Sequence, residues 1–212
     1  MTPFPIILSA PSGAGKTSIA RALLAARSDV GYSVSATTRP RRGHEVEGKD
    51  YHFLSDDDFR RKRAAGEFAE SAEVHGRWYG TLRREVDAVL GAGKHVIMAI
   101  DVQGARQFAR AYPNSVRVFV LPPSVEVLIE RLRARNTESD DLIDRRLRTA
   151  QQEIEAVGEY DYVVVNDQLS VVTKEVSGII DAELKRVPRA TPVNDTISAL
   201  LADLRRAIAA HV

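Results

Sequence analysis

The chain has 212 residues, of which 44% are hydrophobic and 28% are charged, as in an ordinary soluble globular protein of one compact domain or two small ones. Thirty basic and twenty-nine acidic residues give a net charge of +1, which excludes the global basic field of a general nucleic-acid binder. The absence of cysteine excludes a disulfide framework, a thiolate metal site and a cysteine nucleophile. The apolar runs are far shorter than the ~20 residues of a membrane span, and no signal peptide is apparent, so we expect a cytoplasmic protein without a membrane partner.

The predicted elements alternate between strands and helices. Short β-branched apolar runs predict buried strands, and i, i+3, i+4, i+7 spacing predicts helices between them. This alternation predicts an α/β fold with a parallel sheet. A polar, arginine-rich insertion interrupts it first, and a charged segment typical of a mobile loop or lid interrupts it later. In chain order the predictions are strand 6–9, helix 19–26, insertion 33–85, strands 96–100 and 116–121, helix 125–132, lid 135–144, strand 162–165, linker 187–195 and a final helix from 197 to 208.

A phosphate-binding loop follows the first strand. Its sequence is a Walker A pattern with alanine in place of the first glycine: Ala10, Pro11, Ser12, Gly13, Ala14, Gly15, Lys16 and Thr17. The glycines allow backbone N–H groups to face a polyphosphate, and the helix N-terminus adds partial positive charge. Lys16 is expected to reach the β- and γ-phosphates, and Thr17 to bind Mg²⁺. A plain glycine-rich turn is the alternative, but the order of Lys and Thr after a buried strand argues against it.

An acidic residue is expected at the end of a neighbouring strand in such a site. Asp101 follows the apolar run 96–100 and is a candidate partner of Mg²⁺. An aspartate that only caps the next helix is the alternative. No Asn-Lys-x-Asp motif is present, which argues against a GTPase. The five histidines show no metal-ligand spacing, and the basic run 60–63 follows three aspartates and is typical of a solvated helix, so neither another metal nor a nucleic-acid partner is expected.

Several motifs in the insertion and beyond it narrow the class of enzyme. They are SVSATTRPRR at 33–42, EVEGKDYHF at 45–53, GEFAE at 66–70, WYGT at 78–81 and IDVQG at 100–104. In this order they closely resemble guanylate kinase, and the resemblance covers residues 5 to about 186. It implies a P-loop nucleoside monophosphate kinase fold and the reaction of ATP with GMP to give ADP and GDP, with Mg²⁺ bound to ATP. The substrates are then the partners, ATP and GMP.

The resemblance also implies a domain organisation. A guanylate kinase-like domain would span residues 4–184, with its core at 4–32 and 86–184. A GMP-binding α+β domain would be inserted at about 33–85, and the lid would lie at about 135–144. Residues 185–212 would form a linker and an amphipathic helix. The apolar stripe of that helix is expected to pack either on its own core or on another subunit, which allows a homo-oligomer.

The resemblance assigns roles to individual residues. Arg39, Arg42, Tyr51 and Tyr79 would hold the GMP phosphate, where two guanidinium groups and two phenols suit a dianion. Glu70 would accept from guanine N1–H and N2–H₂, Ser35 and Thr81 would donate to O6 and N7, and Gly80 and Asp101 would lie close to the bound nucleotide. Arg135 and Arg146 would close on the phosphates, and Asn166 would lie beside adenine. The catalytic set is then Lys16, Arg39, Asp101, Arg135 and Arg146.

Without the resemblance, several of these residues have plainer interpretations. The arginines at 39–42 would be a solvated basic cluster, Glu70 an exposed charge, and the lid arginines partners of nearby acids. The chain also departs from the family at three positions: Ala99 stands where Asp is common, and His44 and Asn136 stand where Gly is usual. A non-catalytic interaction module of the same fold is a competing hypothesis, against which the intact Lys16 argues. A P-loop kinase for another small substrate is a further one, against which Glu70 argues.

Overall fold

The core sheet is built from short, mostly apolar strands, and the three in its middle are largely buried on both faces. A computed structural model describes residues 2–43, 45–74, 76–134, 140–189 and 191–209. Five parallel strands lie in the order β2-β7-β1-β8-β9. Their bounds are β1 Pro5–Ser9, β2 Val30–Tyr32, β7 His95–Ala99, β8 Val116–Leu121 and β9 Tyr162–Val165. All four strands predicted from apolar runs are present within one residue at each end.

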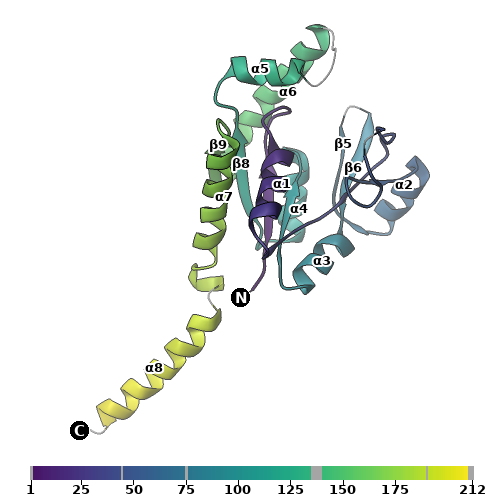
Figure 1. The fold of residues 1–212 in the computed structure, drawn as a ribbon. Coiled ribbons are helices and arrows are strands. Elements are labelled where there is room, and N and C mark those ends of the chain that lie inside the picture. The colour runs from purple at the N-terminus through teal and green to yellow at the C-terminus, as the bar shows by residue number, and fades with distance from the viewer. Residues whose placement is uncertain (1, 44, 75, 135–139, 190, 210–212) are drawn as a thin grey trace.

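Helices cover both faces of this sheet (Figure 1). Ile6 and Leu8 of β1 point to one face, where α1 (Lys16–Ala26) and α7 (Leu169–Glu183) pack on them. Ile7 points to the other face, toward α3 (Arg83–Gly91) and α4 (Val102–Ala111). This alternation is the two-residue period of a strand, and coverage on both faces explains why the central strands are largely apolar.

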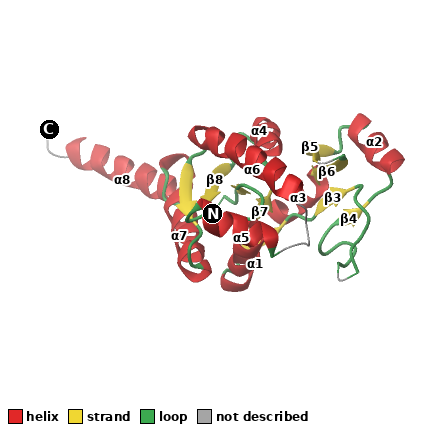
Figure 2. Cartoon of the chain, turned by 90° about the horizontal axis from the view of Figure 1, so that it is seen from above, coloured by secondary structure: helices red, strands yellow, loops and turns green. Residues whose placement is uncertain are grey.

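A second sheet forms a separate lobe beside the core (Figure 2). Its strands lie in the order β4-β3-β6-β5, with bounds β3 Ser35–Thr37, β4 His52–Phe53, β5 Phe68–Val74 and β6 Arg77–Leu82. Helix α2 (Asp56–Ala64) packs Phe59 against Phe68 of this sheet. Ser55 caps α2 by accepting from the N–H of Asp58 at 3.1 Å. This lobe lies within the predicted insertion at 33–85.

Two segments differ from the sequence-based expectation. Residues 140–144 of the predicted lid loop form the first turn of α6 (Asp140–Glu155), which follows α5 (Val125–Arg133). The predicted linker at 187–195 contains a 3₁₀ turn, η2 (Val187–Arg189), and the beginning of α8 (Thr191–Ala209). Polar and proline-rich composition suggested loops, but acidic residues and Pro192 are both compatible with the first turn of a helix. A second 3₁₀ turn, η1 (Ala156–Glu159), follows α6.

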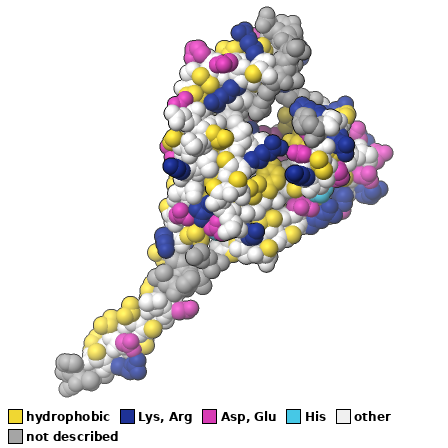
Figure 3. Space-filling view, in the orientation of Figure 1, with side chains coloured by type: hydrophobic (Ala, Val, Ile, Leu, Met, Phe, Trp, Pro, Cys, Tyr) yellow, Lys and Arg dark blue, Asp and Glu magenta, His cyan; other side chains and the backbone are white. Residues whose placement is uncertain are grey.

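Helix α8 extends away from the core, with hydrophobic side chains along one side (Figures 1 and 3). The large side chains of its stripe are 44–64% exposed: Ile197, Leu200, Leu201, Leu204 and Ile208. The stripe therefore does not pack on the core of its own chain. Among the described residues, no helix is long and apolar enough to cross a membrane.

Candidate active site

The phosphate-binding loop lies at the carboxyl end of β1 and runs into α1. Gly13 and Gly15 have φ angles of 92° and 96°, which side chains rarely allow. A Cβ atom on Gly15 would also lie 2.2 Å from the side-chain amide nitrogen of Asn166. Helix α1 begins without a side-chain cap, so its first N–H groups remain available to an anion.

Lys16 and Thr17 occupy the first turn of α1. The Lys16 ammonium donates to the carbonyl oxygen of Ala10 at 2.5 Å, which holds the side chain over the loop. Thr17 is exposed at the mouth of the loop. Among the described residues there is no cluster of three or more acidic or histidine side chains that could hold a metal by itself. One hydroxyl beside a phosphate loop still fits Mg²⁺, because this ion keeps several waters and takes its other ligands from substrate phosphates.

Asn166 supports the loop from the end of β9. Its side chain is buried and donates to the carbonyl oxygen of Ala14 at 2.7 Å. The backbone carbonyl oxygen of Asn166 accepts a hydrogen bond from the Arg131 guanidinium of α5 at 3.1 Å. The side-chain amide of Asn166 thus contacts the phosphate loop. Its predicted place beside adenine stays a prediction.

Helix α5 lies over the same loop. A Cβ atom on Gly13 would come within 3.2 Å of Leu128 and 3.3 Å of Leu132 on α5, so α5 packs directly on the loop. Arg146 lies in α6, which packs on α5 through Leu147 and Ala150. The predicted Arg135 lies outside the described residues, as do the family departures at His44 and Asn136.

The predicted base-reading residues come together in the second lobe. Glu70 of β5 pairs in register with Thr81 of β6, and Thr81 pairs with Ser35 of β3. The Thr81 hydroxyl donates to Glu70 Oε1 at 2.7 Å, and Glu70 is only 5% exposed. Gly80 pairs with both neighbouring strands, opposite Ala36 and Ser71. A buried carboxylate with one occupied oxygen can accept further hydrogen bonds from a ligand.

Asp101 lies close to this carboxylate and caps α4. Its side chain accepts from the N–H of Gly104 at 2.7 Å, so the helix-cap interpretation describes the contact that is present. Burial, together with the negative charge of Asp101, raises the pKa of Glu70 to about 7. Two carboxylates held together attract hydrogen-bond donors or a positive charge.

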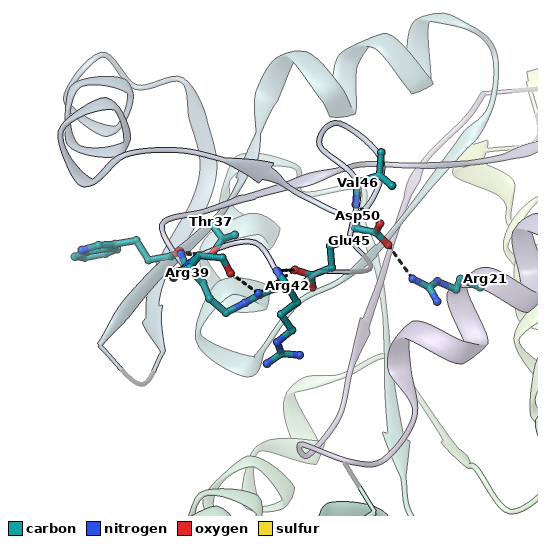
Figure 4. A network of polar contacts seen from close by, with 9 residues as sticks. Arg21, Thr37, Arg39, Arg42, Glu45, Val46 and Asp50 are labelled. Atoms are coloured by element: carbon teal, nitrogen blue, oxygen red, sulfur yellow. Dashed lines mark hydrogen bonds and ion pairs between the residues drawn. The ribbon is translucent and has the colours of Figure 1, made fainter. Parts of the chain in front are cut away.

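The predicted phosphate-binding residues form a second cluster in the same lobe, and Figure 4 shows its two arginines, Arg39 and Arg42. Glu45 accepts from two guanidinium nitrogens of Arg39, at 2.7 Å and 3.0 Å, and from the backbone N–H of Arg42 at 2.8 Å. Arg39 lowers the pKa of Glu45 to about 2. The side chain of Arg42 is exposed and points away from this ion pair in Figure 4. Glu45 thus fixes the orientation of Arg39.

Tyr51 and Tyr79 complete this cluster. Their ring centroids are 6.1 Å apart, and the Arg39 guanidinium lies 5.3 Å from the Tyr51 ring centroid. Burial raises the pKa of Tyr51, so its phenol stays protonated and can donate a hydrogen bond. All four predicted phosphate-binding residues therefore belong to one region of the second lobe.

Two contacts of the candidate site were missed by sequence reasoning. Glu45 had no assigned role, because a single glutamate in a charged segment carries no periodic signal. Arg21 of α1 forms an ion pair with Asp50 at 3.0 Å and joins the phosphate-loop helix to the second lobe (Figure 4). Asp50 also accepts from the N–H of Val46 at 2.9 Å, which fixes the segment after Glu45. Contacts between residues 29 positions apart are not visible in a sequence pattern.

The arrangement is that of a P-loop nucleoside monophosphate kinase, with a phosphate loop on a parallel core and a second lobe inserted beside it. A family model described as guanylate kinase matches residues 2–183. The chain belongs to the guanylate kinase family, and it is a nucleotide-binding transferase of the kinase class.

Individual relatives agree with this assignment. A protein named guanylate kinase from Dechloromonas aromatica (strain RCB) is 47% identical over 176 residues, which are 83% of this chain and 87% of that protein. One from Sphingopyxis alaskensis (strain DSM 13593 / LMG 18877 / RB2256) is 50% identical over 182 residues, covering 85% and 83%. The crystal structure of guanylate kinase from Anaplasma phagocytophilum is 34% identical, with a TM-score of 0.73 and 89% of each chain covered.

Proposed function

We propose that the protein transfers the γ-phosphoryl group of ATP to GMP, giving ADP and GDP. The observation that carries the proposal is the pairing of a Walker A loop with a separate lobe. That lobe holds a buried carboxylate beside a hydroxyl, and an arginine–tyrosine cluster. The Walker A loop suits a polyphosphate. The second lobe suits a nucleoside monophosphate whose base has hydrogen-bond donors on one edge, with the carboxylate facing the base and the arginine–tyrosine cluster facing the phosphate.

GMP binding is assigned to the second lobe. The Glu70 carboxylate would accept from guanine N1–H and N2–H₂, while Ser35 and Thr81 would donate to O6 and N7. The Thr81 hydroxyl has a single proton, which it donates to Glu70 in this structure, so it would have to turn from Glu70 to the base when GMP binds. Arg39, Arg42, Tyr51 and Tyr79 would hold the phosphate dianion, with Arg39 pre-oriented by Glu45. Charge-assisted bonds at both ends fix the phosphate oxygen for direct in-line attack, so no protein nucleophile is needed.

ATP binding is assigned to the core. The loop N–H groups and Lys16 would hold the β- and γ-phosphates, and Arg135 and Arg146 would bring positive charge from the lid to the transferring group. Thr17 would bind Mg²⁺, with Asp101 nearby, and bound Mg²⁺ supplies neutralisation of phosphate charge. Catalysis is then positioning and electrostatic stabilisation.

The test is ADP release with a panel of GMP, dGMP, AMP, CMP and UMP. The proposal expects turnover with GMP well above that with AMP, CMP or UMP. No turnover with any acceptor would contradict it and favour the non-catalytic interaction module. A cytoplasmic location and association of copies through α8 remain predictions, and a mass measurement in solution tests the second.

Ala99 offers a prediction about the missing carboxylate. It ends β7, two residues before Asp101, so an aspartate at 99 would point to the same side of the strand as Asp101. Ala99→Asp is expected to leave activity unchanged or to raise it, most visibly at limiting Mg²⁺. The measurement is the rate of ADP release with ATP and GMP across a Mg²⁺ titration. A large loss would show that the site has been rebuilt around alanine.

The raised pKa of Glu70 predicts how GMP affinity depends on pH. Guanine needs the ionised carboxylate as acceptor, and the pKa of Glu70 is about 7 without ligand. As pH falls below 7 the ionised fraction falls, so GMP affinity is expected to drop about tenfold per pH unit. The measurement is the GMP dissociation constant from pH 5.5 to 8.5. GMP's own phosphate titrates near pH 6, so Glu70→Gln serves as the control that keeps only that titration.

A further inference from the structure

Helix α4 of the core lies directly behind the Glu70 carboxylate. A Cβ atom built on Gly104 would lie 2.6 Å from Glu70 Oε2 and 3.2 Å from its Cδ. No side chain, not even a methyl group, fits at position 104 while Glu70 stays where it is. The other side of the carboxylate is held by Thr81, whose hydroxyl donates to Oε1 at 2.7 Å. The carboxylate is therefore clamped between Gly104 and Thr81.

The strand that carries Glu70 is tied to the same helix. Gln107, one turn after Gly104, accepts from the N–H of Ser71 at 3.2 Å and donates to its carbonyl oxygen at 3.0 Å. Ser71 is the next residue after Glu70 on β5. The side-chain amide thus pairs with β5 as a neighbouring strand would, and it fixes the distance between β5 and α4.

We propose that Gly104 and Gln107 are positioning residues that set the base selectivity of the GMP site from the core. This inference rests on the proposed function, in which Glu70 reads guanine. Gly104 leaves the space in which the carboxylate lies, and Gln107 holds β5 so that this space stays aligned. Base recognition in the second lobe therefore depends on a helix of the first.

The chemistry of guanine makes the position of this carboxylate matter. Two donors, N1–H and N2–H₂, lie side by side and need both bonds at about 2.7–2.9 Å. A methyl group at 104 pushes the flexible end of Glu70 aside rather than the backbone, so it breaks this alignment and not the fold. IMP lacks the 2-amino group and makes only the N1–H bond. Its kcat/KM should therefore fall less than that of GMP when the bond to the 2-amino group is misplaced.

The central experiment compares Gly104→Ala with Gly178→Ala. Both glycines lie inside helices, but nothing lies within 4 Å of a Cβ atom at 178. We expect Gly104→Ala to lower kcat/KM for GMP about 10- to 100-fold, which is the contribution of one charged hydrogen bond. We also expect it to narrow the GMP-to-IMP ratio, meaning kcat/KM for GMP divided by kcat/KM for IMP. Gly178→Ala should change neither. The dissociation constant of ATP should stay the same in both variants.

A second substitution tests the steric cause. Gly104→Ala is compared in the unmodified protein and in the Glu70→Gln background. If the methyl group acts through the Glu70 carboxylate, it should lower kcat/KM for GMP much less in the Glu70→Gln background, whereas a loss of general stability would lower it equally in both. Gln107→Leu keeps the side-chain size but removes both bonds to Ser71. It should raise KM for GMP with little change in kcat, and it should narrow the GMP-to-IMP ratio.

Each outcome bears on one claim. If Gly104→Ala keeps the wild-type ratio of GMP to IMP, the inference is wrong. If that variant does not fold, an unchanged ratio in Gln107→Leu overturns the inference equally. If Glu70→Gln loses selectivity while both α4 variants keep it, the inference fails and the proposed function stands. If the unmodified protein does not phosphorylate GMP, the proposed function fails first.

Discussion

Replacing Lys16 by alanine is expected to lower the rate of phosphoryl transfer by several orders of magnitude. The lysine is the charged side chain of the loop that would contact the β- and γ-phosphates, where negative charge develops in the transition state. Without it, the loop keeps its N–H groups but loses the mobile positive charge. The measurement is kcat for ADP formation at saturating ATP and GMP.

The matched control for this prediction is Lys174→Ala on α7, where the lysine is exposed. The control should keep its activity, and circular dichroism of both variants should match the unmodified protein. The Lys16 side chain contacts the carbonyl oxygen of Ala10, so a small loss of thermal stability is acceptable. Activity within tenfold of the unmodified protein would rule out this loop as the ATP site.

Local patterns predicted the core of the fold well, because its determinants are local. A buried strand, two glycines with positive φ, a lysine and a hydroxyl follow one another within thirteen residues, from Pro5 to Thr17. Four apolar runs likewise appear as parallel strands within one residue of their predicted ends. Backbone conformation requires glycine at particular positions, and burial on both faces requires an apolar run, so both are visible in the sequence.

Contacts between distant segments could not be predicted from the sequence pattern. Glu45 orients Arg39, and Arg21 reaches Asp50 across the two lobes, yet each is one charged residue among many. Gly104 was visible only as part of a motif, and its steric role appears only when Glu70 lies against it. Such roles depend on which segments the tertiary structure brings together, and the family resemblance supplied that information for Glu70 itself.

The polar segments were misjudged for a different reason. Residues 140–144 and 191–195 are rich in polar side chains, which suggested loops, yet both segments begin helices. Acidic residues at a helix N-terminus interact favourably with the helix dipole, and proline is tolerated in the first turn. Composition alone therefore does not separate a loop from the first turn of an exposed helix.

Changing Glu70 to glutamine is expected to lower kcat/KM for GMP by about 100-fold or more. The change keeps the shape of the side chain, removes its charge, and turns one acceptor into an amide donor that faces the donors of guanine. Charged hydrogen bonds are worth about 1.5–3 kcal/mol each, and two of them are lost or reversed. ATP affinity should barely move, because Glu70 lies in the second lobe and the phosphate loop in the core.

The discriminating measurement is kcat/KM for GMP and for AMP, together with the ATP dissociation constant. Adenine has an acceptor at N1 and no donor at C2, so AMP would leave the buried Glu70 carboxylate without any donor from the base. A site of this kind can reject such an analogue by roughly 10⁴-fold. Glutamine removes that penalty, so kcat/KM should fall for GMP and rise for AMP, and the ratio of the two values should become much smaller. Glu73→Gln is the matched control, because Glu73 lies on the same strand but is exposed. If selectivity for GMP survives in Glu70→Gln, a residue other than Glu70 reads the base.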